Sequence, residues 1–355
     1  EKNTFIDTNA PAPEKISDIK VEATPGGAII TYNVPVDPNL SYVKAVYEIQ
    51  QGVSREAKSS YYTDTLNLVG FGDTLSHVVQ LYSVGKNGKE SEVIPITVKP
   101  LTPSVFSVFE TLTLDPTFSG VRVSFQNSAK ASLSIVVLVD TTGQNTWKPV
   151  TTYYTSELNG TFYGRGTFDE TEKRFAIFVR DRWNNKSDSL IKALTPFAEQ
   201  LIPKLPFKIY KLPNDSWQGA TAAYNVEKLW DNIVNVSENV FATVDNVKMP
   251  QWFTVDLGQT VVFSRMKIYQ RVNYPYNGVW VKSFEIWGSN APDADGGWIN
   301  WQKLGTFSSI KPSGLPDPQY TANDIAFVTA GEDFTFDGTI PPVRYMRFVM
   351  TSSRA

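Results

Sequence analysis

Short runs that alternate between apolar and polar residues recur along this chain, and clusters of turn residues separate them. Ala28 to Tyr32 follows the turn Pro25-Gly26-Gly27, and Val78 to Tyr82 leads into Lys86-Asn87-Gly88-Lys89. An alternation with a period of two is typical of a β-strand that buries one face. Short strands at this spacing predict an all-β chain built from sandwich domains.

The strand-and-turn pattern of the first hundred residues returns, in the same order, in the second hundred. Ser119 to Phe125 repeats the shape of Gly26 to Tyr32, and Phe175 to Ser187 repeats that of Val78 to Ser91. Any two β-domains share turn residues, but the common order favours a duplication. Both segments resemble fibronectin type III or immunoglobulin-like modules, which implies two sandwiches that serve as spacers.

Breaks that contain proline divide the chain into domains. Residues 1–15 hold two alanine-proline steps and no apolar period, which predicts a flexible lead-in. Pro100-Leu101-Thr102-Pro103 ends the first repeat, and prolines before Pro206 end the second. We therefore expect sandwiches at residues 16–101 and 102–205 and a third domain at residues 206–355.

The composition excludes most catalytic machinery. The 355 residues include no cysteine, which removes disulfides, thiolate metal sites and cysteine nucleophiles. The one histidine, His77, lies in an alternating run, so we expect a structural or solvent-facing role on a strand. The formal net charge of −3 gives no field that would gather nucleic acid. The missing cysteine and the single histidine together predict a non-catalytic chain. No apolar run approaches the ~20 residues of a membrane span, so we expect no transmembrane helix.

Seven of the nine tryptophans lie beyond Pro206, in a segment of strands joined by long loops. Binding residues concentrate on such loops. Trp252 and Trp287 alternate with polar neighbours, which predicts core packing, and Asp256 is expected to cap its turn. The expected strands are residues 251–258, 261–270, 281–288, 298–307 and 344–350, with a solvated hairpin tip at 293–297 and loops at 231–249, 271–278 and 312–325.

Four stretches in order carry a resemblance to a known family. They are Lys228-Leu229-Trp230-Asp231-Asn232, Pro250 to Gly258, Val281 to Ser289, and Arg344-Tyr345-Met346-Arg347-Phe348. Together they resemble the discoidin, or coagulation factor 5/8 type C, family, which includes galactose-binding-like carbohydrate modules. The resemblance implies a jelly-roll β-sandwich.

With two sandwiches in front, the layout resembles surface lipoproteins of Bacteroidetes polysaccharide-utilisation systems. That resemblance implies an extracytoplasmic protein on the bacterial outer-membrane surface, with a lipid anchor upstream of residue 1. It implies a polysaccharide or oligosaccharide ligand and, as partners, components of an outer-membrane glycan importer.

The candidate ligand-binding residues lie in two loops. Aromatic rings stack on sugar faces, while guanidinium and amide groups bond hydroxyls. The resemblance implies ligand contacts for Arg271 and Asn277; the alternatives are an arginine paired to a carboxylate and a turn asparagine. Trp217 is a stacking candidate, with burial as the alternative. No histidine follows Pro206, so galactose specificity is not predicted. The full set is Trp217, Tyr224, Arg271, Tyr274, Tyr276, Asn277 and Trp280.

No cofactor is expected to be required, but the resemblance implies a structural calcium ion. Asp231, Asn232 and Asn235 would supply oxygen ligands for it.

The leading hypothesis is a non-catalytic cell-surface glycan-binding protein that captures polysaccharide through its C-terminal module. The alternative is a protein-binding adhesin that uses the same discoidin-like loops. A glycosidase would need two carboxylates in one cleft, which the sandwich pattern does not predict.

Overall fold

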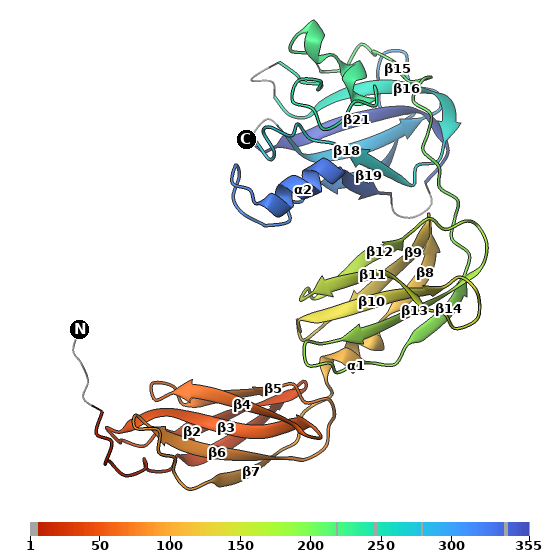
Figure 1. The fold of residues 1–355 in the computed structure, drawn as a ribbon. Helices are drawn as coiled ribbons and strands as arrows, with labels where there is room; N and C mark the ends of the chain where they lie inside the picture. Colours follow the sequence, from red (N-terminus) through yellow and green to blue (C-terminus); the bar gives the residue numbers. More distant parts are fainter. Residues whose placement is uncertain (1–5, 218, 245–247, 278–279, 337–339, 355) are drawn as a thin grey trace. The chain divides into compact units, whose positions relative to one another are not determined.

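The computed structural model describes residues 6–354 apart from 218, 245–247, 278–279 and 337–339 (Figure 1). The chain is nearly all-β and forms two compact units, residues 1–198 and 199–355. The first unit contains two sandwiches and the second contains one, as the sequence pattern predicts.

The first sandwich packs a three-stranded sheet, β1-β2-β5, against a four-stranded sheet, β4-β3-β6-β7. Its core consists of residues that alternate along these strands, such as Ile30, Val43, Leu66 and Leu81. The strands are β1 (Ser17–Thr24), β2 (Gly27–Asn33), β3 (Leu40–Gln50), β4 (Val53–Ser60), β5 (Thr65–Val69), β6 (His77–Gly85) and β7 (Ile94–Val98).

The second sandwich has the same strand order in its sheets, β12-β9-β8 and β11-β10-β13-β14. Leu114, Val123, Ile135 and Ile177 lie in its core. Its elements are α1 (Ser104–Phe109), β8 (Thr113–Thr117), β9 (Gly120–Gln126), β10 (Leu133–Asp140), β11 (Lys148–Thr155), β12 (Asn159–Arg165), β13 (Lys173–Arg180) and β14 (Leu190–Leu194).

The two sandwiches also share individual hydrogen bonds. The Ser91 hydroxyl accepts from the Ser83 N–H at 3.0 Å, and the Ser187 hydroxyl accepts from the Val179 N–H at 2.9 Å. Each serine then donates to the carbonyl of the next residue. A serine at this position therefore satisfies a buried N–H that the strand ladder leaves open, once in each sandwich.

Trp183 of the second sandwich packs against the core of the first. Its indole lies over Gly70, whose φ of +101° and lack of Cβ permit this close approach. The Asn185 amide donates to the Gly70 carbonyl at 3.1 Å and accepts from the Gln50 amide at 3.0 Å. These contacts join the two sandwiches into one compact unit.

Residues 1–15 were expected to be a flexible lead-in, but polar side chains of the first sandwich bind backbone groups within residues 7–14. The Asn87 amide donates to the Ala10 carbonyl at 2.9 Å, and the Asn39 amide donates to the Pro11 carbonyl at 2.8 Å. These carbonyls have no partner in a helix or strand, so they accept hydrogen bonds from the side-chain amides. The bonds hold the segment against the sandwich.

The third sandwich consists of a five-stranded sheet, β15-β16-β21-β18-β19, and a two-stranded sheet, β17-β20. Phe253, Ile286, Phe334 and Phe348 lie in the core between them. The strands are β15 (Lys208–Ile209), β16 (Gln251–Val261), β17 (Arg265–Ile268), β18 (Val281–Ser289), β19 (Gln302–Ser308), β20 (Glu332–Thr335) and β21 (Val343–Ser353); the helices are the 3₁₀ turns η1 (Ala222–Tyr224) and η2 (Val226–Leu229), and α2 (Ala322–Ala330).

The core placement predicted for Trp252 and Trp287 is wrong. Their neighbours Phe253 and Ile286 face the core, so the two tryptophans point to the other face of the sheet. There both rings meet Trp298 edge to face, at centroid distances of 5.4 and 5.1 Å.

The loop between β18 and β19 folds onto this outer face, so the expected solvated tip at residues 293–297 is exposed only at Ala294 and Asp295, and Gly296 is buried. The fully buried Arg347 guanidinium lies 4.3 Å from the Trp298 and Trp301 rings and donates to the Gly296 carbonyl. The Asn214 amide also donates to that carbonyl.

Candidate functional site

The candidate site centres on Arg271, which follows β17 by three residues. Its guanidinium donates to the Glu238 carboxylate at 2.8 Å and lies 5.0 Å from the centre of the Tyr274 ring. The Tyr224 hydroxyl donates to the other Glu238 oxygen at 3.3 Å. The structure therefore brings Tyr224, Arg271 and Tyr274 together, although 50 positions separate the first from the last.

Trp280 and Asn277 belong to the same loop. The Trp280 indole N–H donates to the Tyr274 carbonyl at 2.9 Å, and the Trp280 backbone N–H donates to the Asn277 carbonyl at 2.9 Å. Tyr274 is 52% exposed, while Trp280 and Asn277 are half-buried. Aromatic surface, a guanidinium and an amide thus lie on one turn of chain.

Tyr276 does not lie on the surface beside them, so its expected place in a ligand contact set is corrected. Its φ is +55°, which is unusual for a bulky residue, and its side chain is fully buried. The Lys311 ammonium lies 5.1 Å from the centre of the ring, and the Arg354 guanidinium lies 4.8 Å from it. Burial, and then the nearby Glu332 carboxylate, raise the pKa of the Tyr276 hydroxyl to about 12.

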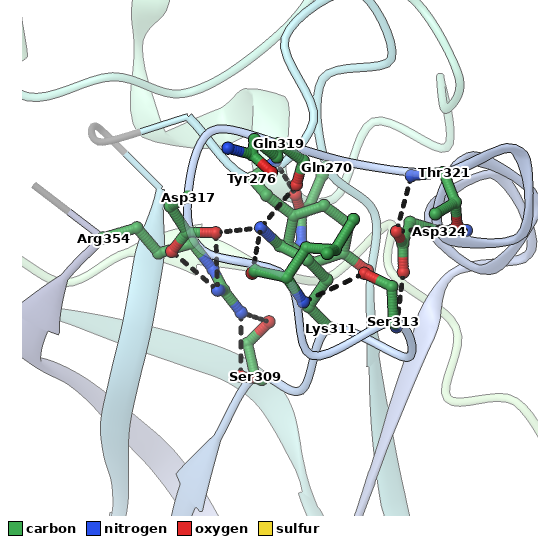
Figure 2. A network of polar contacts seen from close by, with 11 residues as sticks. Gln270, Tyr276, Ser309, Lys311, Ser313, Asp317, Gln319, Thr321, Asp324 and Arg354 are labelled. Carbon is green, nitrogen blue, oxygen red and sulfur yellow. Dashed lines mark hydrogen bonds and ion pairs between the residues drawn. The ribbon is translucent and has the colours of Figure 1, made fainter. Parts of the chain in front are cut away.

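Lys311 and Arg354 converge on Asp317 beside this ring, as Figure 2 shows. The Lys311 ammonium also donates to the Leu315 and Gln319 carbonyls, at 3.1 and 2.7 Å. The loop before α2 therefore wraps around a buried ammonium group. The network fixes the Tyr276 ring and, with it, the turn that carries Arg271 and Tyr274.

Trp217, the expected stacking platform, packs against the core of the third sandwich. Its ring meets Phe241 edge to face at 5.8 Å, and the Lys211 ammonium lies 5.3 Å from its centre. A ring covered in this way has little free face for a sugar, so the alternative of burial describes it better.

The structure does not support the expected calcium ion. The Asp231 carboxylate accepts from the Ile233 N–H at 2.9 Å and from the Asn239 amide at 2.6 Å, so donors occupy both oxygens. Asn232 and Asn235 have φ of +65° and +59°, which is typical of turn asparagines. Among the described residues, no three His, Cys, Asp or Glu side chains form a group that could hold a metal ion.

Glu238 is the site residue that the sequence analysis missed as a ligand-site group. It is 33 positions from Arg271, in a loop whose sequence has no periodic pattern. Only its hydrogen bond to Arg271, seen in the structure, identifies it as part of the site. The alternative of an arginine paired to a carboxylate is therefore present, and the pair is at the surface, with the Glu238 side chain 68% exposed.

His77 begins β6, as predicted, and its Nε2 lies 2.7 Å from an Asp73 carboxylate oxygen. Its ring packs against Phe71 at 4.6 Å. Within the described part of the chain, no helix combines the length and apolar character needed to cross a membrane.

Three family models, each described as a domain of unknown function, match successive parts of the chain. DUF4959 matches residues 13–100, DUF5126 matches residues 101–205 and DUF5000 matches residues 230–354. A search of the curated proteins finds no match.

The fold is a succession of β-sandwiches, and among solved structures the chain is similar to "SusE-like protein BT2857". The identity is 32%, over 71% of this chain and 93% of that one, with a TM-score of 0.44. The identity and its coverage show that the chain belongs to the SusE-like family.

Two further solved structures are less similar to this chain. A two-domain fibronectin type III segment of chicken tenascin is 13% identical over 51% of this chain and 99% of that one, with a TM-score of 0.25. The module CBM32-3 of a family 31 glycoside hydrolase from Clostridium perfringens is 16% identical over 42% and 82%, with a TM-score of 0.30.

Proposed function

We propose that this protein is a non-catalytic glycan-binding protein of the bacterial cell surface, and that its C-terminal module captures polysaccharide. It would act outside the outer membrane, held there by a lipid anchor, in a Bacteroidetes polysaccharide-utilisation system and beside glycan importer components. Membership of the SusE-like family and the discoidin-like order of the C-terminal stretches support this assignment.

The observation that carries the proposal is the position of Arg271 between Glu238 and the exposed Tyr274 ring. Sugar rings offer apolar C–H faces and hydroxyls, and this surface offers an aromatic ring, guanidinium donors and a carboxylate acceptor. The Glu238 bond orients the guanidinium before a ligand arrives, which lowers the entropy cost of binding. The proposed contacts are Tyr224, Glu238, Arg271, Tyr274, Asn277 and Trp280.

Affinity electrophoresis of the whole chain against plant, host and microbial polysaccharides tests the proposal. We expect at least one glycan to retard the parent, and Arg271→Gln and Tyr274→Ala each to weaken binding about tenfold or more, as for a lost charged hydrogen bond or stacking ring. Lys208→Ala, an exposed charge on β15, serves as the control. If both site variants fold and bind like the parent, the site is wrong.

A second candidate function is protein binding. Leu229, at the end of η2, and Ile233 and Val234, in the loop that follows, are exposed aliphatic side chains. Such a group without polar partners favours contact with a protein surface. If no glycan retards the folded chain, this alternative expects Ile233→Ser with Val234→Ser, and not Arg271→Gln, to abolish retention of the chain by isolated outer membranes.

A further inference from the structure

The first sandwich is open along one side, where the free edges of its two sheets face each other. Strand β4 ends the four-stranded sheet and β5 ends the three-stranded sheet (Figure 1). A groove of about 850 Å³ lies between them, and Arg182 and Trp183 of the second sandwich also line it. Strand β5 has five residues and therefore extends for about 15 Å along the groove.

The side chain of Tyr47 forms the floor at one end. Its hydroxyl donates to the Val69 carbonyl at 3.1 Å and accepts from the Val69 N–H at 3.2 Å. Because backbone groups alternate along a strand, the N–H and C=O of Asn67 point to the same free edge. The groove thus presents backbone and amide groups to a ligand.

Two guanidinium groups at this end have no anionic partner in the part of the chain that the structure describes. Arg55 is the cross-strand neighbour of Tyr47 and points to the same side of the sheet. Among the described residues, neither Arg55 nor Arg182 forms an ion pair with a carboxylate, and the Arg182 guanidinium lies 4.4 Å from the centre of the Trp183 ring. The Glu56 carboxylate of the same groove is paired to Lys58 at 2.9 Å.

The opposite end carries hydroxyls and an exposed aromatic pair. Ser60 and Thr63 line the groove on either side of the turn that holds Tyr61 and Tyr62. The two rings lie 3.9 Å apart, and Tyr62 is 80% exposed. The one further carboxylate in the groove, Asp64, is at this end, where it accepts from the Thr65 hydroxyl at 3.0 Å. Glu56 and Lys58 neutralise each other, so the unpaired guanidinium groups of Arg55 and Arg182 lie at the Val69 end of the groove and Asp64 lies at the other.

We propose that this groove binds a segment of an anionic glycan. Carboxylate or sulfate groups pair with Arg55 and Arg182, and sugar rings lie toward the hydroxyls and the Tyr61–Tyr62 pair. The lining favours a sugar over an acidic peptide, because it offers hydroxyl, amide and aromatic groups but only Ala57 and Val69 as aliphatic surface. The inference rests on the proposed function, since it takes the ligand to be a polysaccharide, and it adds a second contact site and a charge preference.

The test measures binding of the whole chain to polygalacturonate, dextran sulfate and uncharged dextran. We expect the parent to bind at least one anionic polymer, more weakly as salt increases. Arg55→Gln with Arg182→Gln should weaken that binding about tenfold or more, and Tyr62→Ala should weaken it less. The control, Arg122→Gln with Lys130→Gln, removes the same charge from the second sandwich outside the groove and should bind within about twofold of the parent.

The variant of the C-terminal site separates the two proposals. If Arg271→Gln abolishes binding of the anionic polymer and the groove variant does not, the groove is overturned and the proposed function stands. If the parent binds neither anionic polymer, the groove is overturned, and the polysaccharide panel alone decides the proposed function. If polyglutamate of equal charge competes as well as polygalacturonate, the site is a general anion site and the glycan assignment is wrong.

Discussion

Arg347 shows how one side chain organises a whole face of the third sandwich. The residue is fully buried, with an Asp215 carboxylate oxygen 3.7 Å from its guanidinium. Burial lowers the pKa of Arg347 and raises that of Asp215, so each charge depends on the other. The pair contributes little to the free energy of folding, because the desolvation of two buried charges offsets most of their attraction. Its main effect is to fix the positions of the side chains around it.

Trp217 gives a prediction at the same scale. Because the ring packs on the core and against Phe241, Trp217→Ala should lower the free energy of unfolding of the C-terminal unit by about 3 kcal/mol. Trp217→Phe should cost less, since it keeps an aromatic ring there. Denaturant unfolding followed by tryptophan fluorescence measures both. An alanine variant that loses glycan binding with unchanged stability would restore Trp217 as a stacking platform.

Helix α2 begins with a reciprocal cap that depends on an ionised carboxylate. The Thr321 hydroxyl accepts from the Asp324 N–H, and the Asp324 carboxylate accepts from the Thr321 N–H. Burial opposes ionisation of Asp324, but N–H donors from Thr321 and Ser313 prevail and lower its pKa to about 2. The cap therefore links this helix to acid stability.

The sign of that link follows from a folded pKa below the ordinary 3.8. The stability that the Asp324 carboxylate contributes is fully present above about pH 4 and is lost as the pH falls toward about 2. We expect the Tm of the parent to exceed that of Asp324→Asn at pH 5, and the gap to close between pH 4 and pH 2. Calorimetry over that range checks this, and a gap that stays constant would contradict it.

Elements differ in how far the sequence predicts them. Strands β16, β18 and β21 follow the predicted ranges closely, because a period of two is a local pattern. Helix α2 was missed in the expected loop 312–325, although Thr321-x-x-Asp324 before apolar residues is a capping signal. Of the strand expected at residues 261–270, only β17 (Arg265–Ile268) is present, and Val261 belongs to the end of β16.

The site is less predictable than the strands. Alternation shows that Trp252 and Phe253 face opposite sides, but not which side lies on the core. The buried position of Tyr276 depends on Lys311 and Arg354, which are distant in the sequence. Arg271 and Tyr274 of the proposed binding site could be selected from the sequence by residue type, whereas their partner Glu238 is identified only by the fold.

At the scale of the whole molecule, the contacts of Trp183 predict coupled unfolding. Because its indole fills space over Gly70 in the first sandwich, residues 1–198 should unfold in one calorimetric transition. Trp183→Ala should split it into two, and Trp147→Ala, which changes a ring of the same sandwich near Arg174, should not. Two transitions in the parent would show that the sandwiches are independent.

The charged edge of the first sandwich has a consequence for crowding. A free strand edge is a template on which another copy of the chain can add a strand. Arg55, Glu56 and Lys58 make such pairing unfavourable along β4, and Tyr47 occupies the backbone groups of Val69 on β5. Where many copies of the chain are crowded together, Arg55, which we propose to bind an anion, also helps to keep neighbouring copies from pairing, so a substitution of Arg55 changes both properties.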